Sequence, residues 1–303
     1  MAIHEQNYVR YEGALRERGA WWVIARASLR VYWSFLRTKL TLLFVSLGPV
    51  IFAVLVFLEF SFRQSQLGKM GGGGAAPGSG PLLFYMHAQT VALALVLAAG
   101  GCGVIADDLR YKTFQLYFSK PLTRVDYAFG KAMSLFLLGG LVTIVPTVLL
   151  GGLRVAFFAQ TAHASVVAKQ TGMGLLFMMG ITAMCAALVS GLSSLTERTG
   201  YVVLAWLGLC AVPLLVQIIV GIAAPEGSDV GYLMSLNGNL HLLAKWALDG
   251  ADVKLILSSA QTAGEAPKTS TLFNLLPLLI LLGAGGGGAG LLWRRISKLE
   301  GVA

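Results

Sequence analysis

Residues 132–153 read AMSLFLLGGLVTIVPTVLLGGL, a run of 22 residues without a single Asp, Glu, Lys or Arg. An apolar helix of about 20 residues is long enough to cross the hydrocarbon core of a bilayer. In lipid, a single apolar run can satisfy its own backbone hydrogen bonds only as a helix. The run is therefore predicted to be a membrane-spanning helix.

Five further stretches of the same kind lie on either side of this one. They cover residues 41–60, 82–105, 171–195, 201–224 and 271–293. The chain of 303 residues is 56% hydrophobic and 12% charged, whereas globular domains are about 25% charged. This composition argues against a soluble enzyme. The predicted fold class is an all-α membrane protein with six transmembrane helices, in which residues 1–40 form a tail and an interfacial helix and residues 41–303 form the transmembrane domain.

The distribution of positive charge predicts the orientation of these spans. Six spans place both termini on one side of the membrane, and the segments on that side carry 16 of the 23 Lys and Arg residues. Because cytoplasmic loops are enriched in Lys and Arg, both termini are expected in the cytoplasm. The net charge of +9 is thus explained by topology, and no nucleic-acid partner is expected. The predicted location is the cell inner (cytoplasmic) membrane, with several passes through the bilayer.

An amphipathic segment precedes the first span. Apolar residues recur at helical spacing and arginines form a separate stripe. The apolar set is Trp22, Ala25, Leu29, Trp33 and Leu36, and the arginines are Arg26, Arg30 and Arg37. Such a helix is suited to lie flat in the headgroup region. The alternative is an ordinary cytoplasmic helix that packs on the bundle.

Glycine is unusually dense in the last span. The spacings Gly283 to Gly287 and Gly286 to Gly290 allow a second helix to approach closely. The sequence leaves open whether that second helix belongs to this chain or to another copy.

The segment between the second and third spans, residues 106–131, predicts two short helices. Asp107 and Asp108 suit the first turn of a helix, where carboxylates face the positive end of the helix dipole. Pro121 would end that helix, and Thr123 can cap a second helix that continues into the third span. A short cytoplasmic helix held between two membrane helices is suited to contact with a soluble partner, because force on it would move both spans.

This segment resembles the first cytoplasmic loop of ABC-2 type permeases, the membrane subunits of a large group of ATP-binding-cassette exporters. The matching residues, in the family's order and spacing, are Thr113, Ser119, Pro121, Leu122, Thr123, Arg124, Tyr127, Gly130 and Lys131. Lys112 stands where the family usually has glycine, so the backbone turn is expected to differ there. A weaker likeness covers the whole chain, with its interfacial helix, six spans, long outer region before the last span and basic tail.

The resemblance implies that this loop is a coupling helix for a separate ATPase. The residues expected to contact the ATPase are Asp107, Asp108, Thr113, Leu116, Ser119, Pro121, Leu122, Thr123 and Arg124. The sequence contains no G-x-x-x-x-G-K-[ST] phosphate loop, so ATP and Mg²⁺ are expected in the partner subunit and no cofactor in this chain. The resemblance also implies two ATPase subunits and a second permease copy, identical or related. The alternative for the loop is a basic connection that only fixes topology.

The sequence shows no motif for catalysis or for metal binding. His4 and Glu5 lack a second histidine at the metalloprotease spacing, and Cys102, Cys185 and Cys210 lie in apolar stretches without paired ligand spacing. No catalytic residue, no metal site and no enzymatic activity is therefore expected for this polypeptide alone.

Polar residues inside the spans are candidates for a translocation path. Under the predicted orientation they fall in the outer part of their helices, where they would line a wetted vestibule for cargo. They are Glu59, His87, Gln89, Gln217 and Asn274. The alternative is that several of them lie at headgroup level.

The predicted function is a permease subunit of an ABC transporter that forms the translocation pathway, most simply for export. Two alternatives stay open. An ion-gradient-driven secondary transporter would usually carry internal repeats and an ionisable site at mid-membrane, neither of which is evident. A non-transporting membrane scaffold is the other. The cargo and the choice between homodimer and heterodimer cannot be read from the sequence.

Overall fold

A computed structural model describes most of the chain. It covers residues 19–67, 80–113, 117, 122–159, 163–223 and 271–300, together with 233, 235, 238, 239, 242 and 243. Throughout these residues the regular structure is helical, without strands. Within the same part of the chain, six helices are long and apolar enough to cross a membrane. The predicted fold class, an all-α protein with six spans, is confirmed.

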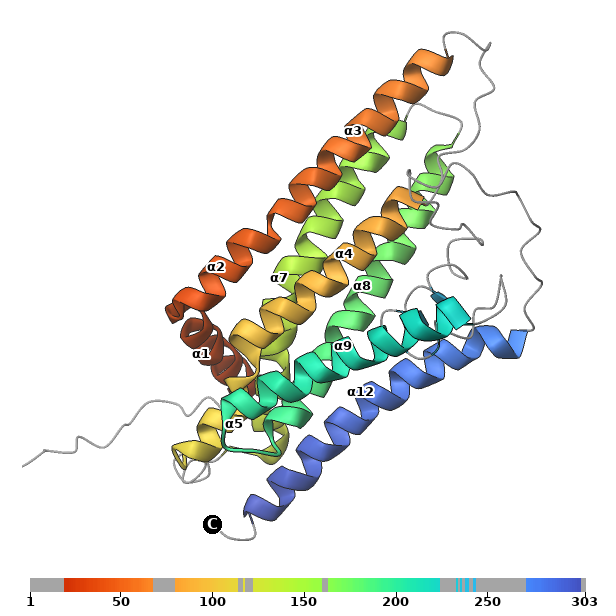
Figure 1. The fold of residues 1–303 in the computed structure, drawn as a ribbon. Coiled ribbons are helices and arrows are strands. Elements are labelled where there is room, and N and C mark those ends of the chain that lie inside the picture. Colours follow the sequence, from red (N-terminus) through yellow and green to blue (C-terminus); the bar gives the residue numbers. More distant parts are fainter. Residues whose placement is uncertain are drawn as a thin grey trace, which may run out of the picture.

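The helices follow one another in a simple up-and-down order (Figure 1). In chain order they are α1 (Ala20–Ser34), α2 (Leu36–Val45), α3 (Leu47–Leu67), α4 (Gly80–Val96), the π-helix η1 (Leu97–Gly101), α5 (Gly103–Arg110), α7 (Arg124–Phe158), α8 (Ala164–Ser193), α9 (Thr199–Ala223) and α12 (Thr271–Glu300). Two of the six spans are composite. The first joins α2 to α3, and the second joins α4, η1 and α5.

The helix ends that make up the candidate site lie together at one end of the bundle. Figure 1 shows α1, α5, the start of α7, the connection from α8 to α9 and the end of α12 at this end, which we call the α5 end. The chain returns to the α5 end after every second span. The cytoplasmic placement of this end stays a prediction, based on its excess of Lys and Arg.

The centre of the bundle is formed by α7 and α8. In their most apolar 18-residue windows these two helices are 50% buried and the second span, which packs on them, is 56% buried, whereas the first span is 17% and α9 11% buried. The core includes Leu93, Leu97, Leu135, Leu138 and Val189, all of them fully or almost fully buried. The exposed side chains of the outer helices are largely apolar, as expected for surfaces that face lipid chains.

Helix α1 packs closely on α7 at Gly130. A Cβ atom at this position would lie 2.7 Å from the carbonyl oxygen of Trp21, so only glycine permits the approach. As a result, the buried face of α1 consists of Ile24, Ala25, Ser28 and Tyr32. The predicted apolar face differs from this one, because of its five residues only Ala25 is fully buried, while Trp22 and Trp33 stay exposed. Helix α1 therefore both packs on the bundle and presents an aromatic outer surface.

One face of α12 packs against α8 of the same chain, through Gly288. A Cβ atom on Gly288 would lie 2.7 Å from the carbonyl oxygen of Ala187, and one on Gly191 would lie 2.4 Å from the carbonyl oxygen of Gly288. Helices α8 and α12 thus cross with their backbones in contact. The pairs with predicted spacing, Gly283 with Gly287 and Gly286 with Gly290, do not make this contact with α8, since a Cβ built on any of the four would have no atom of another helix within 4 Å.

Candidate functional site

The second span changes helical form just before it leaves the bundle. Five residues, Leu97–Gly101, form a π-helix, after which α5 begins at Gly103. Such a change interrupts the regular i to i−4 bonding of the helix. Around it, side chains of α8 and α9 hydrogen-bond to backbone groups of the second span. The Trp206 indole on α9 donates to the Ala94 carbonyl at 2.9 Å.

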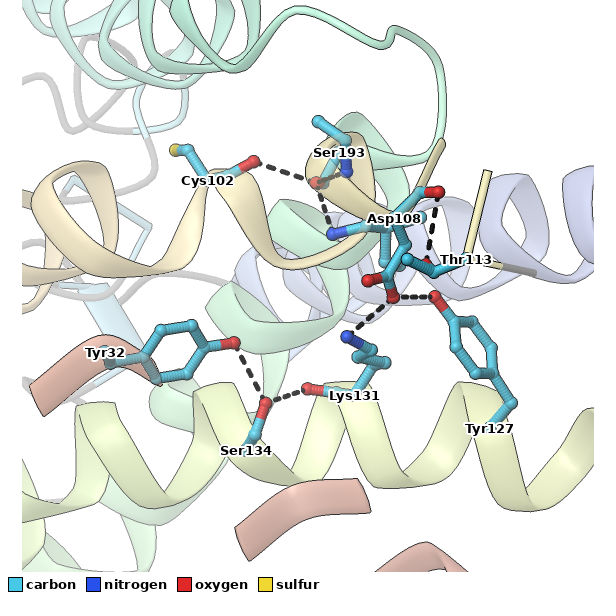
Figure 2. Close-up of polar contacts among 10 residues, drawn as sticks. Tyr32, Cys102, Asp108, Thr113, Tyr127, Lys131, Ser134 and Ser193 are labelled. Atoms are coloured by element: carbon cyan, nitrogen blue, oxygen red, sulfur yellow. Dashed lines mark hydrogen bonds and ion pairs between the residues drawn. The ribbon is translucent and has the colours of Figure 1, made fainter. Parts of the chain in front are cut away.

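Ser193, at the end of α8, provides the most complete of these contacts. Its hydroxyl accepts from the backbone N–H of Ile105 at 3.0 Å and of Ala106 at 2.9 Å, and it donates to the Cys102 carbonyl at 2.8 Å. Figure 2 shows the Ser193 oxygen between these three groups. One hydroxyl thus satisfies the first turn of α5, and it fixes the end of the second span to the end of the fourth.

Asp108 connects the second span to the third. Its Oδ2 accepts from the Lys131 ammonium at 2.7 Å and from the Tyr127 hydroxyl at 2.6 Å (Figure 2). The Lys131 side chain is 6% exposed and that of Asp108 14%. Water therefore screens this ion pair far less than an ion pair on a surface. Both partners of the carboxylate lie on α7 one turn apart, which orients that helix against α5.

Asp107 forms the corresponding contact with the fifth span. Its Oδ1 accepts from the Thr199 hydroxyl, the first residue of α9, at 2.7 Å. The other carboxylate oxygen lies over Gly103, where an added Cβ would be only 2.6 Å away. We call Asp107, Asp108, Tyr127, Lys131, Ser193 and Thr199 the polar junction. It joins α5, α7, α8 and α9 at the α5 end.

The predicted position of the two aspartates in the first turn of a helix is wrong. They lie in the second half of α5, whose first turn carries no acidic residue. The helix that contains them is the end of the second span and not the start of a new helix. This span ends in a Schellman motif, in which Thr113 N–H donates to the Asp108 carbonyl at 3.0 Å and Lys112 N–H to the Leu109 carbonyl at 3.3 Å.

Lys112 has the left-handed backbone that this motif requires, with a φ of 55°. Glycine usually occupies this position because it has no Cβ to strain. The family resemblance predicted a different turn here, because the family usually has glycine where this chain has Lys112. Instead, the lysine adopts the conformation that glycine favours. The Thr113 carbonyl in turn accepts from Tyr117 N–H at 3.1 Å.

The predicted cap of the next helix is confirmed. Thr123 accepts from the backbone N–H of Asp126 at 3.1 Å, and its hydroxyl donates to the Asp126 carboxylate at 2.6 Å. Helix α7 begins at Arg124, which is half-buried, and Leu122 packs against the core. Thr113 donates its hydroxyl to the Asp108 carbonyl at 3.3 Å. The other predicted contact residues, Leu116, Ser119 and Pro121, lie outside the described residues.

Aromatic rings enclose the buried ammonium. Lys131 Nζ lies 5.8 Å from the centroid of the Tyr117 ring and 5.7 Å from that of Tyr127. Burial raises the pKa of the Tyr117 hydroxyl, and the negative charge of Asp108 raises it further. Below the junction, the Tyr32 hydroxyl meets the Ser134 hydroxyl at 3.1 Å and so ties α1 to α7. The aromatic rings and the carboxylate together hold one cation in place.

Exposed apolar side chains surround the polar junction. Tyr111 is 68% exposed, Val125 59% and Leu195 54%. They come from the end of α5, the start of α7 and the α8–α9 connection, all at the α5 end (Figure 1). We call these three residues the apolar rim. Lys112 and Arg198, at the same end of the bundle, are exposed as well.

The predicted path residues lie on four different helices. Gln89 is buried in α4 and reaches toward Gly48 at the start of α3, whereas His87 is half-buried. Gln217 on α9 hydrogen-bonds with Ser235. Glu59 on α3 and Asn274 on α12 have side chains outside the described part. Their convergence on one vestibule stays a prediction.

Reasoning from the sequence missed part of the junction. Lys131 was predicted only as a residue of the family motif and not as the partner of Asp108. A lysine at the edge of a charge-free span nevertheless indicates a buried partner. Ser193 and Thr199 carry no such signal, since hydroxyl residues are common in membrane helices. Within the described residues, no group of three His, Cys, Asp or Glu side chains is placed to hold a metal ion.

The fold and the junction together define a multi-pass helical membrane protein whose spans are fastened at one end by a polar network. The sequence matches the family described as "ABC-2 family transporter protein" over residues 33–283. The chain therefore belongs to the ABC-2 family and is a membrane subunit of an ABC transporter. Among curated proteins, no sequence matches it.

Proposed function

We propose that the α5 end is the docking site for a separate ATP-binding-cassette ATPase, and that the polar junction passes the movement of this ATPase to the spans. ATP and Mg²⁺ would bind in the partner and not in this chain. The complex would contain two ATPase subunits and a second permease copy, would lie in the inner membrane, and would export its cargo. The outer polar residues His87, Gln89 and Gln217 are the proposed exit path.

The observation that supports this proposal most strongly is the double contact of Asp108 with Tyr127 and Lys131. Because a buried ion pair is costly to break, α5 and the start of α7 should move as one body when either is pushed. Asp107 extends the same connection to α9 through Thr199. A force on the turn at Lys112 would therefore reach three spans rather than one.

The apolar rim supports the docking part of the proposal. Tyr111, Val125 and Leu195 flank the turn on which such a force would act, and a partner would remove them from water. At about 25 cal/mol per Å² of apolar surface buried, three such side chains contribute substantially to binding. The partner can shift the conformation of the spans only if it prefers one arrangement of this end over another.

Affinity purification of the tagged full-length chain from its native membranes tests the proposal. We expect an ABC ATPase to co-purify, and Tyr111→Asp or Val125→Asp to reduce its amount at least about tenfold, because each would place a charge in the interface. Asp108→Asn should keep the ATPase bound but reduce the response of ATP turnover to the permease. Lys298→Asp is the matched control on α12, also exposed at this end, and should behave like wild type.

Two results would overturn the proposal. One is that no ATPase is recovered with the wild-type chain. The other is that both rim variants retain wild-type amounts of ATPase while remaining folded, as judged by their elution in gel filtration.

A further inference from the structure

An apolar groove of about 570 Å³ lies between the first span and α7. Its volume falls in the range of small-molecule binding sites. One wall comes from α2 and α3, with Leu42 and Val50 among its residues, and the other from α7, with Leu141 and Leu149. Pro146 also lines the groove, so that α7 presents a stretch of backbone there without an amide donor.

The groove is long enough for the acyl chain of one leaflet. Its lining runs from Lys39 on α2 to Ala53 on α3. At 1.5 Å per residue this distance is about 20 Å along nearly continuous helices. One leaflet contributes about half of the 30 Å hydrocarbon core. A single chain that entered at the Lys39 end would therefore be covered over its whole length.

Only one end of the groove is charged. The structure describes all residues that line the groove, and Lys39 is the one charged residue among them. Trp33 also lines the groove. Residues 19–58 contain Arg26, Arg30, Arg37 and Lys39 but no Asp or Glu. Lys39 lies close to the start of the first span, at Leu36, where lysine extends its ammonium to the headgroups and tryptophan favours the interface.

We propose that this groove binds one anionic phospholipid, with an acyl chain between α3 and α7 and its phosphate at Lys39. The lipid would come from the leaflet at the α5 end. The charge arrangement favours this occupant over a helix from a second copy, because Lys39 is placed at headgroup level, where an apolar helix would offer its ammonium no counter-charge. An anionic lipid carries its phosphate in that layer already. The site goes beyond the proposed function and does not depend on an ATPase partner.

Native mass spectrometry of the purified full-length chain tests the charged end of the site. The chain is equilibrated with phosphatidylglycerol or with phosphatidylcholine, and the lipid retained per chain is counted. We expect wild type to retain one phosphatidylglycerol in preference to phosphatidylcholine. Lys39→Gln should reduce that preference about fivefold, the effect of one basic residue near an anionic surface. Lys298→Gln, an exposed lysine at the same end, should leave it unchanged.

A second pair of variants tests the apolar part. Val50 lines the groove and is 62% exposed, whereas Ile51, the next residue of α3, is 60% exposed but lies outside the lining. Val50→Trp should fill the groove and abolish retention of either lipid, and Ile51→Trp, which points to another face of the helix, should not. Both substitutions add bulk to an exposed position, so neither is expected to unfold the chain.

Three outcomes would overturn the site. The first is equal retention of the two lipids by wild type, which would indicate ordinary surrounding lipid. The second is an equal loss with Lys39→Gln and Lys298→Gln, which would indicate unspecific attraction. The third is that Val50→Trp changes the oligomeric mass of the particle, which would show that a second copy of the chain occupies the groove.

Discussion

The ammonium of Lys131 lies 2.7 Å from the carboxylate of Asp108, with the Tyr127 hydroxyl 2.6 Å from the same oxygen. Asp108 is at the end of the second span and Lys131 near the start of the third. The ion pair and the hydrogen bond therefore join the end of the second span directly to the start of the third. Under the proposed function, an ATPase docked on the α5 end would act on this connection.

Removing the carboxylate charge should destabilise the chain strongly. Asp108→Asn leaves the Lys131 ammonium buried without its counter-charge, which costs about 3 kcal/mol of unfolding free energy. Unfolding in mixed detergent micelles with increasing dodecyl sulfate measures this loss. Lys131→Met combined with Asp108→Asn should recover part of it, because the double variant buries no lone charge.

A matched control for this pair is Glu197→Gln. Glu197 is exposed in the α8–α9 connection at the same end, and removing its charge should change the stability by less than about 0.5 kcal/mol. A strictly additive double variant would show that Asp108 and Lys131 do not interact.

Ser193→Ala should cost about 2 kcal/mol, because it removes the buried hydrogen bonds of this hydroxyl with Ile105 N–H, Ala106 N–H and the Cys102 carbonyl. The same unfolding assay applies. Ser297→Ala is the control, since its hydroxyl only donates back to the Trp293 carbonyl of its own helix. Equal losses in the two variants would refute the special role of Ser193.

Lys112→Gly should stabilise the chain by about 1 kcal/mol. The left-handed backbone at this residue strains a side chain with a Cβ but not glycine. Arg110→Gly, at the last residue of α5, should have the opposite sign, because glycine is less favourable than arginine in a right-handed helical backbone. A destabilising effect of Lys112→Gly would mean that the lysine side chain itself makes a needed contact.

Gly288→Ala should separate α8 from α12, whereas Gly287→Ala should be tolerated. The first Cβ would collide with the backbone of α8, and the second would meet open space. Overpacking of this kind costs about 1–3 kcal/mol, while alanine for glycine in an open helix position is neutral or stabilising. Unfolding in mixed micelles measures the free energy of unfolding of both variants. A loss of stability with Gly287→Ala alone would contradict the contact between α8 and α12 described above.

The chain should lose stability at alkaline pH partly through Tyr32. Burial raises the pKa of this hydroxyl above its ordinary value, and the charges of Asp108 and Asp107 add to the effect. The unfolded chain then releases the proton first, so this stability is present below about pH 10 and is lost as the pH rises further.

Tyr32→Phe should therefore show a shallower decline in stability between about pH 10 and 12. At neutral pH it should be less stable than wild type by about 1 kcal/mol, since the hydrogen bond to Ser134 is lost. Tyr111→Phe, at an exposed tyrosine, is the control and should keep the wild-type slope. An unchanged slope in Tyr32→Phe would refute the assignment.

Much of the fold could be predicted because its signals are local. Each span can be recognised by its length and its lack of charged residues. The Thr123 cap can be predicted because a hydroxyl residue stands three positions before an acidic one. The aspartate prediction was wrong because Asp107 and Asp108 are equally acceptable in a short new helix or at the end of a span. Only their distant partners, Lys131 and Thr199, distinguish the two.

The number and order of the spans, the amphipathic helix before them and the family of membrane transport subunits could all be predicted from the order of residues. The contact between α12 and α8 at Gly288, the buried face of α1 and the contacts of Ser193 with the second span became known only from the folded chain. Hydrophobic length and capping depend on neighbours along the chain, whereas close backbone crossings and buried ion pairs depend on residues that folding brings together.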